Sequence, residues 1–570
     1  MRVMSLSIMI VLLCCTLVLD PASAGSQRLI AEDQWERFLQ DIIDYADSKV
    51  PGHLKAQATS GPRAGRFGTY NCRTDENIVL HAFLYQEPRS KYYHDPAHLK
   101  RILMHLDYFC RGQSINGGYD EIDKWVCNGD VGVMGPDYGD ASRLEARNGI
   151  IGFTMYAIGR GMTLLFEDHA DTGNMDFINA LDKLVDHDYD GATDESEGTP
   201  KITRRKALMQ LIDGSHLRHI TYKGMDNVEC KGGGLIDYLF FTTSAHGHDP
   251  HFSGGCANLT TGVINGIYFL NLAYNYLRNP KTGGNGAPSF IDNNEEFVIA
   301  YRDWLFGRKN PSRVFTVGGR TFVDDDRPIQ FYGGNRATKE QCFSSKGMVK
   351  EGGPVGPNSK GNGYDGNYGV ISLQLIGTYA SHSGDPVAKA FVTKMIEGYQ
   401  YFYVLDPNHP KGGYHHYQTV RRNPGNGGIP PLVYGLVRNY HDAAKKLFLE
   451  SVNSFVRSGR DMDLFFREAG SRQVECGWVV EFFENDPSYY LATDYVLPCN
   501  REKPFGYYDK GGVESAYLSV HKTGSQPTSV TWKAYQWNSL NVPPGAVKNG
   551  SILEYTYQGR NSWMERYRKR

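Results

Sequence analysis

The sequence predicts an α+β multidomain protein in which an N-terminal α/α toroid is followed by a C-terminal antiparallel β-domain. Three observations carry this prediction. Apolar residues recur at helical spacing through much of the first 440 residues. Beyond them, short segments rich in β-branched and aromatic residues alternate with Gly, Pro and Asn turns. Helices that come first and strands that come afterwards are typical of segregated layers rather than of an alternating βαβ sheet.

The first 24 residues have the organisation of a secretory signal peptide. Arg2 precedes an apolar run from Leu6 to Leu19, and small residues follow up to Ala24. We therefore expect a secreted chain whose mature form begins near Gly25. No later segment approaches the ~20 consecutive apolar residues that a membrane span needs, so the sequence predicts no membrane span.

Helical periodicity is found in several segments after the signal peptide. They are Trp35–Tyr45, Ile78–Tyr85, His98–Phe109, Ile150–Phe166, Val263–Leu277, Phe297–Phe306, Val370–Tyr379, Val387–Tyr403 and Ala443–Val456. Helices paired in this way, with their loops gathered at one end, would build an α/α toroid over residues 25–440. The long loops between them are rich in Gly, Asn and Asp, and loops of such length are usually functional.

Residues 441–570 are predicted to form the β-rich domain. Its expected strands are Val474–Phe483, Tyr489–Leu497, Val513–His521, Ser529–Trp537 and Ile552–Tyr557. The mature chain is longer than a single hydrophobic core usually serves, which also favours two domains.

Cysteine usage and charge narrow the class of protein further. Ten cysteines are present, of which Cys14 and Cys15 lie in the signal peptide. The even number that remains favours disulfides in an oxidising compartment. Two pairs are close enough in sequence to be reasonable guesses, Cys110 with Cys127 and Cys476 with Cys499. The net charge of -2 gives no basic footprint, so no nucleic-acid partner is expected.

Residues 186–197 match the calcium-loop template D-x-D-x-D-G-x5-E. A hard cation such as calcium needs oxygen ligands at this spacing, and a glycine for the sharp turn. The predicted ligands are Asp186, Asp188, Asp190, Ala192 (through its carbonyl), Asp194 and Glu197. Thr193 at position 8 and Pro200 beyond the loop depart from the template, so a solvated acidic turn is the alternative. A bound calcium ion is expected to be structural rather than catalytic.

Two predicted loop-to-helix junctions contain residues that could carry chemistry, tyrosines at one and an asparagine at the other. Tyr364 and Tyr368 lie four residues apart in the glycine-rich stretch Asn362–Gly369, where phenols could transfer protons or simply form a surface turn. Asn258 opens the helix predicted from Val263, where it could cap the helix. Asn258 also begins a glycosylation sequon, as does Asn549. Because a glycan would exclude Asn258 from a cleft, the catalytic and glycosylation interpretations compete.

A pair of arginines follows a pair of histidines near the end of the predicted toroid. Arg421 and Arg422 come shortly after His415 and His416. The planar guanidinium group matches carboxylates and sulfates, so an acidic glycan would be a natural partner. The alternative is a solvated charge cluster.

Together these pieces resemble a known family. Gly255–Thr260 is similar to the Gly-Ala-Asn segment, and Tyr364–Gly369 to the Tyr-x-Gly-x-Tyr-Gly segment, of the hyaluronate, chondroitin AC and xanthan lyases. Those enzymes have an α/α toroid followed by β-sandwich domains. The resemblance implies a lyase that cleaves an acidic polysaccharide by β-elimination. Asn258 would neutralise the uronate carboxylate, Tyr368 would exchange the proton, and Arg422 or Arg421 would orient the tyrosine or the substrate, without a metal.

The sequence departs from this family in two important respects. The family has a histidine shortly before its tyrosine loop, and residues 351–367 contain none. A second acid or base would then come from elsewhere, for which His246, His248, His251, His415 and His416 are available. The residues expected to bind substrate are Arg421, Tyr364, Arg336, His416, His251 and Trp125. The β-region is also much shorter than that of the family.

Two other classes of protein remain open. An inverting glycoside hydrolase would need two carboxylates across ~6.5–9.5 Å of one cleft. The acidic residues available for it are Asp324, Asp325, Asp326, Glu351 and Asp365. A non-catalytic extracellular protein that binds glycan or calcium is favoured by the missing histidine and by the sequon at Asn258.

Overall fold

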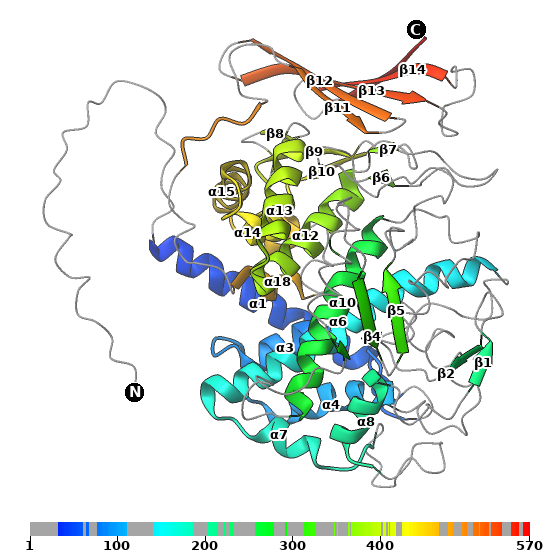
Figure 1. Cartoon of the computed structure of the whole chain (residues 1–570). Helices are drawn as coiled ribbons and strands as arrows, with labels where there is room; N and C mark the ends of the chain where they lie inside the picture. The colour runs from blue at the N-terminus through cyan, green and yellow to red at the C-terminus, as the bar shows by residue number, and fades with distance from the viewer. Residues whose placement is uncertain are drawn as a thin grey trace, which may run out of the picture.

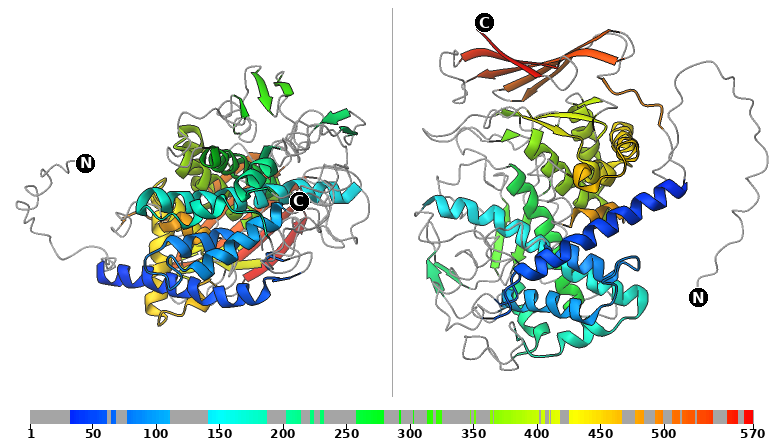
Figure 2. Two further views of the ribbon diagram at one scale, coloured as in Figure 1. Left: turned by 90° about the horizontal axis from the view of Figure 1, so that it is seen from below. Right: turned by 180° about the vertical axis from the view of Figure 1, so that it is seen from behind.

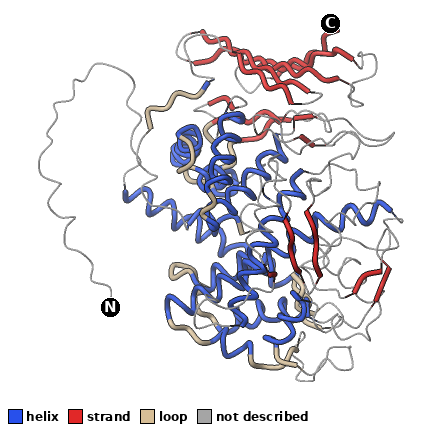
Figure 3. Tube along the Cα trace, in the orientation of Figure 1, coloured by secondary structure: helices blue, strands red, loops and turns tan. Residues whose placement is uncertain are grey.

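The structure is a computed structural model, and it describes the chain in separate stretches (Figures 1 and 3). The described residues are 32–60, 64–67, 77–110, 141–186, 202–213, 221–223, 229–231, 257–278, 291–292, 302, 313–317, 320–324, 347, 350–351, 363–364, 366–400, 403–405, 409, 411–417, 425–466, 477–483, 493–498, 506–511, 514–523, 526–537, 549–557 and 563–569. Within these stretches, several strands and helix ends, including the whole C-terminal sheet, are described by their backbone alone.

Helices form the main body of the protein. They are α1 (Glu32–Ala56), α3 (Asn77–Gln86), α4 (Pro96–Cys110), α6 (Ala141–Thr172), α7 (Asp176–Leu181), α8 (Arg204–Asp213), α10 (Ala257–Arg278), α12 (Gly366–Ser383), α13 (Pro386–Tyr399), α14 (Pro431–Val437), α15 (Asp442–Arg457), α16 (Met462–Phe466) and α18 (Trp478–Phe483). Six of them contact one another in a closed ring, in the order α3, α6, α10, α12, α14, α18 and back to α3. Around the ring, α1 and α4 pack on α3, α13 packs on α12, and α15 packs on α14. Both views of Figure 2 show α1 running along the outside of the body.

Neighbouring ring helices α6, α10 and α12 run parallel to one another. Between α6 and α10, Tyr156 lies 5.5 Å from Phe269 and Phe166 lies 5.0 Å from Tyr276, measured between ring centroids. The numbers of the contacting residues rise together along both helices, which is the mark of parallel packing. Gly159 allows the close approach, because a Cβ there would lie 2.6 Å from the backbone nitrogen of Leu270. Parallel neighbours place their N-terminal ends at the same end of the ring.

A local turn explains how the chain leaves the ring and returns along its outside. Gly384, with φ +68°, follows the last residue of α12 in a left-handed conformation that glycine adopts without strain. Asp385 then caps α13, accepting hydrogen bonds from the backbone nitrogens of Val387 at 2.8 Å and Ala388 at 3.4 Å. Pro386 occupies the first turn of α13, where its missing N–H costs nothing. Three consecutive residues, Gly384, Asp385 and Pro386, therefore encode the hairpin between α12 and α13.

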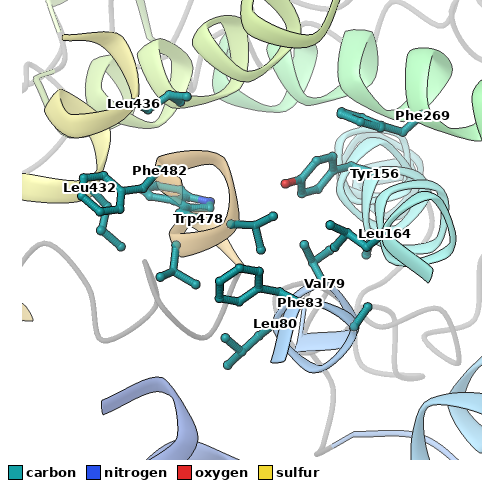
Figure 4. Packing of buried hydrophobic residues seen from close by; sticks show 14 of the residues in the cluster. Val79, Leu80, Phe83, Tyr156, Leu164, Phe269, Leu432, Leu436, Trp478 and Phe482 are labelled. Carbon is teal, nitrogen blue, oxygen red and sulfur yellow. The ribbon is translucent and has the colours of Figure 1, made fainter. Parts of the chain in front are cut away.

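The hydrophobic core lies inside the ring. Figure 4 shows side chains of α3, α6, α10, α14 and α18 converging on one another, among them Phe83, Tyr156, Phe269 and Trp478. Residues 77–85 of α3 are all buried, so this helix is surrounded by protein on every side. Helices α15, α16 and α18 contribute Phe448, Phe465 and other residues to the same core. The chain after residue 440 therefore continues the helical body.

The predicted fold class, an α/α toroid followed by a C-terminal antiparallel β-domain, is wrong, because the chain after residue 440 continues the helical body. Where the structure describes side chains, 75% of the residues are helical and 3% are in strands. The segment predicted as the strand Val474–Phe483 contains α18, a helix that buries Trp478, Val479, Val480 and Phe482. Residues 493–497, predicted as part of the next strand, are not extended in a sheet. Burial inside the ring outweighed the β-propensity of these side chains.

The backbone of the last stretches runs as five antiparallel strands. They are β11 (Gly506–Gly511), β12 (Glu514–Thr523), β13 (Gln526–Trp537), β14 (Asn549–Tyr557) and β15 (Trp563–Lys569), paired in sequence order. The strands predicted at Val513–His521, Ser529–Trp537 and Ile552–Tyr557 correspond to β12, β13 and β14. Only the backbone of these strands is described. In Figure 1 the sheet lies across one end of the helical body, where β12 contacts β7 (Gly363–Tyr364).

Most of the helices predicted before residue 457 are confirmed. The periodic segments that begin at Trp35, Ile78, His98, Val370 and Ala443 coincide with α1, α3, α4, α12 and α15. The predicted segments Ile150–Phe166 and Val263–Leu277 are shorter than the helices that contain them, because α6 begins at Ala141 and α10 at Ala257. The segment Val387–Tyr403 ends too late, since α13 stops at Tyr399 and Tyr403 starts a strand. The helix predicted at Phe297–Phe306 falls outside the described residues except for Arg302.

Short strands lie in the loops between the helices. They are β1 (Thr221–Lys223), β2 (Glu229–Lys231), β3 (Ile291–Asp292), β4 (Arg313–Val317), β5 (Arg320–Asp324), β6 (Lys350–Glu351), β7, β8 (Tyr403–Leu405), β9 (Gly413–Tyr417) and β10 (Gly425–Gly428). All pair antiparallel, as β1–β2, β3–β4–β5, β6–β7 and β8–β9–β10. The last two groups lie near the end of the ring that the C-terminal sheet covers (Figure 1).

Candidate active site

Helices α10 and α12 begin side by side at one end of the ring. Thr261 Oγ1 donates to Ser372 Oγ at 3.4 Å, Asn265 Nδ2 donates to the Leu375 carbonyl at 2.8 Å, and Tyr268 Oη donates to the His382 carbonyl at 3.1 Å. The partners advance together along both helices, so α10 and α12 are parallel and in fixed register. Their first turns therefore lie at the same level.

Two residues selected from the sequence occupy these first turns. Asn258 is the second residue of α10 and precedes Thr261 by three positions. Tyr368 is the third residue of α12 and precedes Ser372 by four positions. Residues three or four apart share one face of a helix. Asn258 and Tyr368 thus stand one turn before a pair of touching residues, on helices that pack about 8–10 Å apart.

The position after Tyr368 is a close-packing site that only glycine fits. A Cβ on Gly369 would lie 2.1 Å from the phenol oxygen of Tyr399 and 2.4 Å from its Cζ. The ring of Tyr399, which is only 1% exposed, therefore packs directly against the first turn of α12. This contact fixes the backbone next to Tyr368 and explains why the glycine-rich sequence continues into the helix.

The strand before α12 carries the other tyrosine of this stretch. Tyr364 lies in β7, which pairs with β6 in the register Lys350 with Tyr364 and Glu351 with Gly363. The pairing holds the entry to α12 in an extended conformation. It also places the backbone of Glu351 at the end of the ring where α10 and α12 start.

A second group of selected residues lies in a hairpin beside α12. His415 and His416 are in β9, which contacts α12 and pairs with β10 through His416 opposite Asn426. Tyr417 opposite Gly425 closes the hairpin. Arg421 and Arg422 belong to the connection between these strands, whose residues 418–424 lie outside the described part.

Several other predicted residues also lie outside the described residues. They are Trp125, His251 and Arg336 among the substrate-binding candidates, and His246 and His248 among the histidines. Cys110 is described, at the buried end of α4, whereas its suggested partner Cys127 is not. Their proposed roles stay predictions from the sequence.

The predicted calcium loop is described only at its base. Asp186 is the first predicted ligand, and residues 187–201, which include the remaining ligands Asp188, Asp190, Ala192, Asp194 and Glu197, lie outside the described part. The preceding helix α7 ends at Leu181, and α8 begins at Arg204. A bridge between Leu184 and Thr203 brings the two ends of the loop together. Among the described residues, no group of three His, Cys, Asp or Glu side chains could hold a metal ion.

A buried ion pair fastens the base of this loop to α4. The carboxylate of Asp107 accepts from Arg204 Nε at 2.5 Å and from Arg204 Nη2 at 2.6 Å. It also accepts from the backbone nitrogen of Asp186 at 3.2 Å. The Asp107 side chain is 0% exposed and that of Arg204 is 3% exposed. The loop therefore leaves from a rigid base, whatever it binds.

A buried polar junction at the centre of the ring was not anticipated from the sequence. The carboxylate of Glu481 on α18 accepts from Tyr156 Oη at 3.0 Å and from Arg160 Nε at 3.2 Å, both on α6. On its other oxygen it pairs with His382 Nε2 of α12 at 2.5 Å. Arg160 also pairs with Glu167 at 3.0 Å. One carboxylate thus joins three ring helices.

The charges around Glu481 favour its ionised form. Burial by itself raises the pKa of this carboxyl group, but the charges of His382 and Arg160 and the hydrogen bonds from His382 and Tyr156 hold it well below its usual range. A signal was present in the sequence: a lone glutamate inside the apolar run Trp478–Phe483 needs a buried partner. The identity of that partner could not be deduced from the run itself.

This junction is not part of the site at the helix N-termini. His382 is on the same helix as Tyr368, but fourteen residues farther along, which places it about 21 Å away at 1.5 Å per residue. The imidazole of His382 therefore cannot supply the second acid or base beside Tyr368. We interpret the junction as a structural feature of the ring.

Comparison with known proteins gives no independent assignment: no protein-family model matches the chain, and no curated protein matches its sequence. Among the described helices, none has the length and apolar character to cross a membrane. Any functional conclusion therefore depends on the residues of the chain and on their placement at the ends of α10 and α12.

Proposed function

We propose that this chain is a secreted enzyme that cleaves a uronic-acid-containing polysaccharide by β-elimination. The observation that supports the proposal best is that the first turns of α10 and α12 lie at the same level. Asn258 and Tyr368, which resemble the amide and the acid/base of known lyases, are far apart in sequence but begin neighbouring parallel helices in register.

The helix ends also suit an anionic substrate. The first backbone N–H groups of a helix have no partner within the helix, and the macrodipole makes this end positive. Two parallel helices, α10 and α12, present such ends side by side. A uronate carboxylate bound there would be stabilised by N–H groups as well as by the amide of Asn258, and its neutralisation would acidify the proton on the neighbouring carbon C5.

The elimination needs only one group that exchanges a proton. The phenolate of Tyr368 removes the C5 proton, the electrons of that C–H bond form the C4–C5 double bond, and the C4–O bond breaks. The departing oxygen then takes the proton from the Tyr368 hydroxyl, which regenerates the phenolate. A free tyrosine has a pKa of about 10, so a cation is needed nearby. Arg421 and Arg422, in the chain segment that connects β9 and β10, would supply it.

The reaction is tested by its product. Hyaluronan, chondroitin, alginate and glucuronan are incubated separately with the protein while the ultraviolet absorbance of the unsaturated product is recorded. Tyr368→Phe should abolish turnover and leave glycan binding intact, whereas Tyr93→Phe, at an exposed site on the loop before α4, should remain fully active. Equal activity of wild type and Tyr368→Phe would refute the assignment.

The competition between amide and glycan at Asn258 can be resolved separately. Thr260→Ala destroys the glycosylation sequon but keeps the amide, while Asn258→Ala removes both. If the amide neutralises the substrate, only Asn258→Ala loses activity. If Asn258 carries a glycan instead, both variants lose the mass of that glycan in intact-protein mass spectrometry, in addition to the mass change of each substitution.

A hydrolase is the second candidate, because the β6–β7 pairing places Glu351 at the same end of the ring as Tyr368. An inverting hydrolase needs a second carboxylate opposite the first, for which Asp365 is close in sequence. Reducing ends that appear without ultraviolet absorbance would favour this reaction. Binding of a glycan without either product would indicate a non-catalytic binding protein.

A further inference from the structure

A column of stacked rings lies where α1, α3 and α4 meet. Tyr92 stacks on His98 with ring centroids 4.6 Å apart, His98 on His81 at 4.9 Å, and His81 on Phe67 at 4.3 Å. The planes are inclined by only 25°, 17° and 18°. The ring of His105 also lies next to Phe67, at 4.8 Å and tilted by 43°.

The hydrogen bonds of the column suit neutral imidazoles. His98 Nε2 donates to the His81 carbonyl at 3.2 Å, and His53 Nδ1 lies 3.3 Å from His81 Nε2, close enough for one to donate to the other. His81 is 0% exposed and His98 is 2% exposed. The Nδ1 atoms of His81 and His98 are buried and have no hydrogen-bond partner among the described residues. A proton added to either atom would have no acceptor.

The charged groups around the column do not compensate for added protons. Lys49 of α1 acts on His53, and Arg101 of α4 acts on His81. Arg66, also buried, precedes Phe67. Among the described residues, the carboxylate that acts on these histidines is Asp95, at the start of α4 near His98. Asp463 lies 3.4 Å from Lys49 and offsets part of the charge of that lysine. Protonation of the column would therefore add positive charge close to Lys49 and Arg101, with Asp95 as the carboxylate that opposes it.

Burial is the main reason why these imidazoles resist protonation. It lowers the pKa of His53 to about 4, with Lys49 lowering it further. It lowers the pKa of His98 to about 4, although the bond to the His81 carbonyl and Asp95 act in the opposite direction. The pKa of fully buried His81 lies well below its ordinary value, through burial and then through the neighbouring histidines.

The column also fastens a particular segment of the chain. His53 is in the last turn of α1, and Phe67 belongs to the described residues 64–67, which follow along the chain. Gln57, between them, donates to the Gly65 carbonyl at 2.6 Å and accepts from Arg101 Nε at 2.6 Å. The end of α1 and residues 64–67 are thus held on α3 and α4 through the histidines and their neighbours.

We propose that this histidine column is an acid-sensitive lock, which holds the end of α1 and residues 64–67 against α3 and α4 at neutral pH and releases them on acidification. The closed form binds fewer protons than the open form, in which a histidine has a pKa of about 6.5. Closure therefore weakens as the pH falls from about 6.5 and levels off below about 4. At pH 5, each histidine with a pKa of about 4 makes opening roughly 30-fold easier. His53 and His98 together would favour opening by roughly 900-fold.

Amide hydrogen exchange of the full chain tests the lock. Residues 50–60 and 64–67 should lose protection below about pH 5.5, after correction for the intrinsic pH dependence of exchange, while α13 and α15 stay protected. The double variant His81→Phe, His98→Phe keeps a stack of aromatic rings and removes two protonation sites but leaves His53, so going from neutral pH to pH 5 should favour its opening at least about 30-fold less than that of wild type. His169→Phe, outside the column, should behave as wild type. Opening of the double variant at the same pH as wild type would overturn the proposal.

A second measurement needs no variant. The exchange rate of the imidazole C2 hydrogen, followed by mass spectrometry, reports the pKa of each histidine in the unmodified protein. Values below about 5 for His53, His81 and His98 are expected from their burial. Values near about 6.5 for two of them, as in model peptides, would overturn the proposal even if the double variant failed to fold.

Discussion

Replacing Glu481 with glutamine tests whether the central junction holds the ring together. The change keeps the size and shape of the side chain and removes its negative charge. Arg160, which is 0% exposed, would then lose its partner on α18, and His382 would lose its partner at 2.5 Å. The hydrogen bond from Tyr156 could still reach the amide oxygen. The perturbation is therefore mainly electrostatic.

The expected loss of stability follows from burial. Removing one partner of a buried ion pair typically costs about 3–5 kcal/mol, because the other charge stays buried without compensation. Here Arg160 keeps Glu167, whose side chain is 33% exposed, so the loss should fall at the lower end. We expect about 3 kcal/mol. At about 2 °C per kcal/mol for a chain of this size, the midpoint of thermal unfolding should fall by about 6 °C.

Urea unfolding at pH 7, followed by far-ultraviolet circular dichroism, measures the effect. Asp463→Asn is the matched control, since Asp463 is 75% exposed and pairs with Lys49 at 3.4 Å. An exposed pair of this kind contributes about 0–1 kcal/mol. A loss in Glu481→Gln no larger than in the control would show that the junction does not hold α6, α12 and α18 together.

The pH dependence of this difference has a definite sign. The pKa of Glu481 in the folded protein lies below its ordinary value, so its contribution is complete above the unfolded value of about 4.3. It is lost as the pH falls through the lowered folded value. The gap in stability between wild type and Glu481→Gln should therefore be constant near neutral pH and shrink in acid below about pH 4.3.

Two further substitutions test the close packing at Tyr368 and the base of the predicted calcium loop. Gly369→Ala would place a Cβ 2.1 Å from the phenol oxygen of Tyr399, so we expect the free energy of unfolding measured in urea to fall by about 1–3 kcal/mol and the proposed lyase activity to be lost. Gly52→Ala, with open space around it in α1, should be neutral or stabilising by up to about 1 kcal/mol, and a similar loss in both variants would contradict the packing argument. Asp107→Asn leaves the buried Arg204 without its carboxylate, which should cost about 3–5 kcal/mol and raise amide exchange in residues 183–186 and 202–204. Unchanged exchange in those residues would show that the ion pair does not hold the loop base.

Local sequence patterns accounted for most of the helices. Apolar residues at a spacing of three or four positions predicted α1, α3, α4, α12 and α15. The prediction works because each of these helices buries the faces on which those apolar residues lie. The turn between α12 and α13 likewise follows from Gly384, Asp385 and Pro386. The strand prediction at Val474–Phe483 failed, because Trp, Val and Phe fit a strand and a buried helix equally well in so short a segment.

The candidate site was predicted as a set of residues without an arrangement. The sequence singled out Asn258 because it opens a predicted helix and Tyr368 because it lies in a glycine-rich loop. That both stand at the same end of the ring depends on contacts between α10 and α12, such as Thr261 with Ser372. Tyr399 was missed altogether, because its closeness to Gly369 results from the return of α13 along α12. The histidine column escaped notice for the same reason: His53, His81 and His98 come from three helices.

The sequence by itself determined where most of the helices before residue 457 form and how some of them end, because caps, turns and apolar periodicity act over a few neighbouring residues. Only the tertiary structure decided that residues 478–483 are helical, that Glu481 meets Tyr156 and Arg160 from more than 300 positions earlier in the chain, and that α10 and α12 start in register. A buried charge requires partners wherever they occur in the sequence. Such pairings depend on which elements pack together, and no local pattern specifies that.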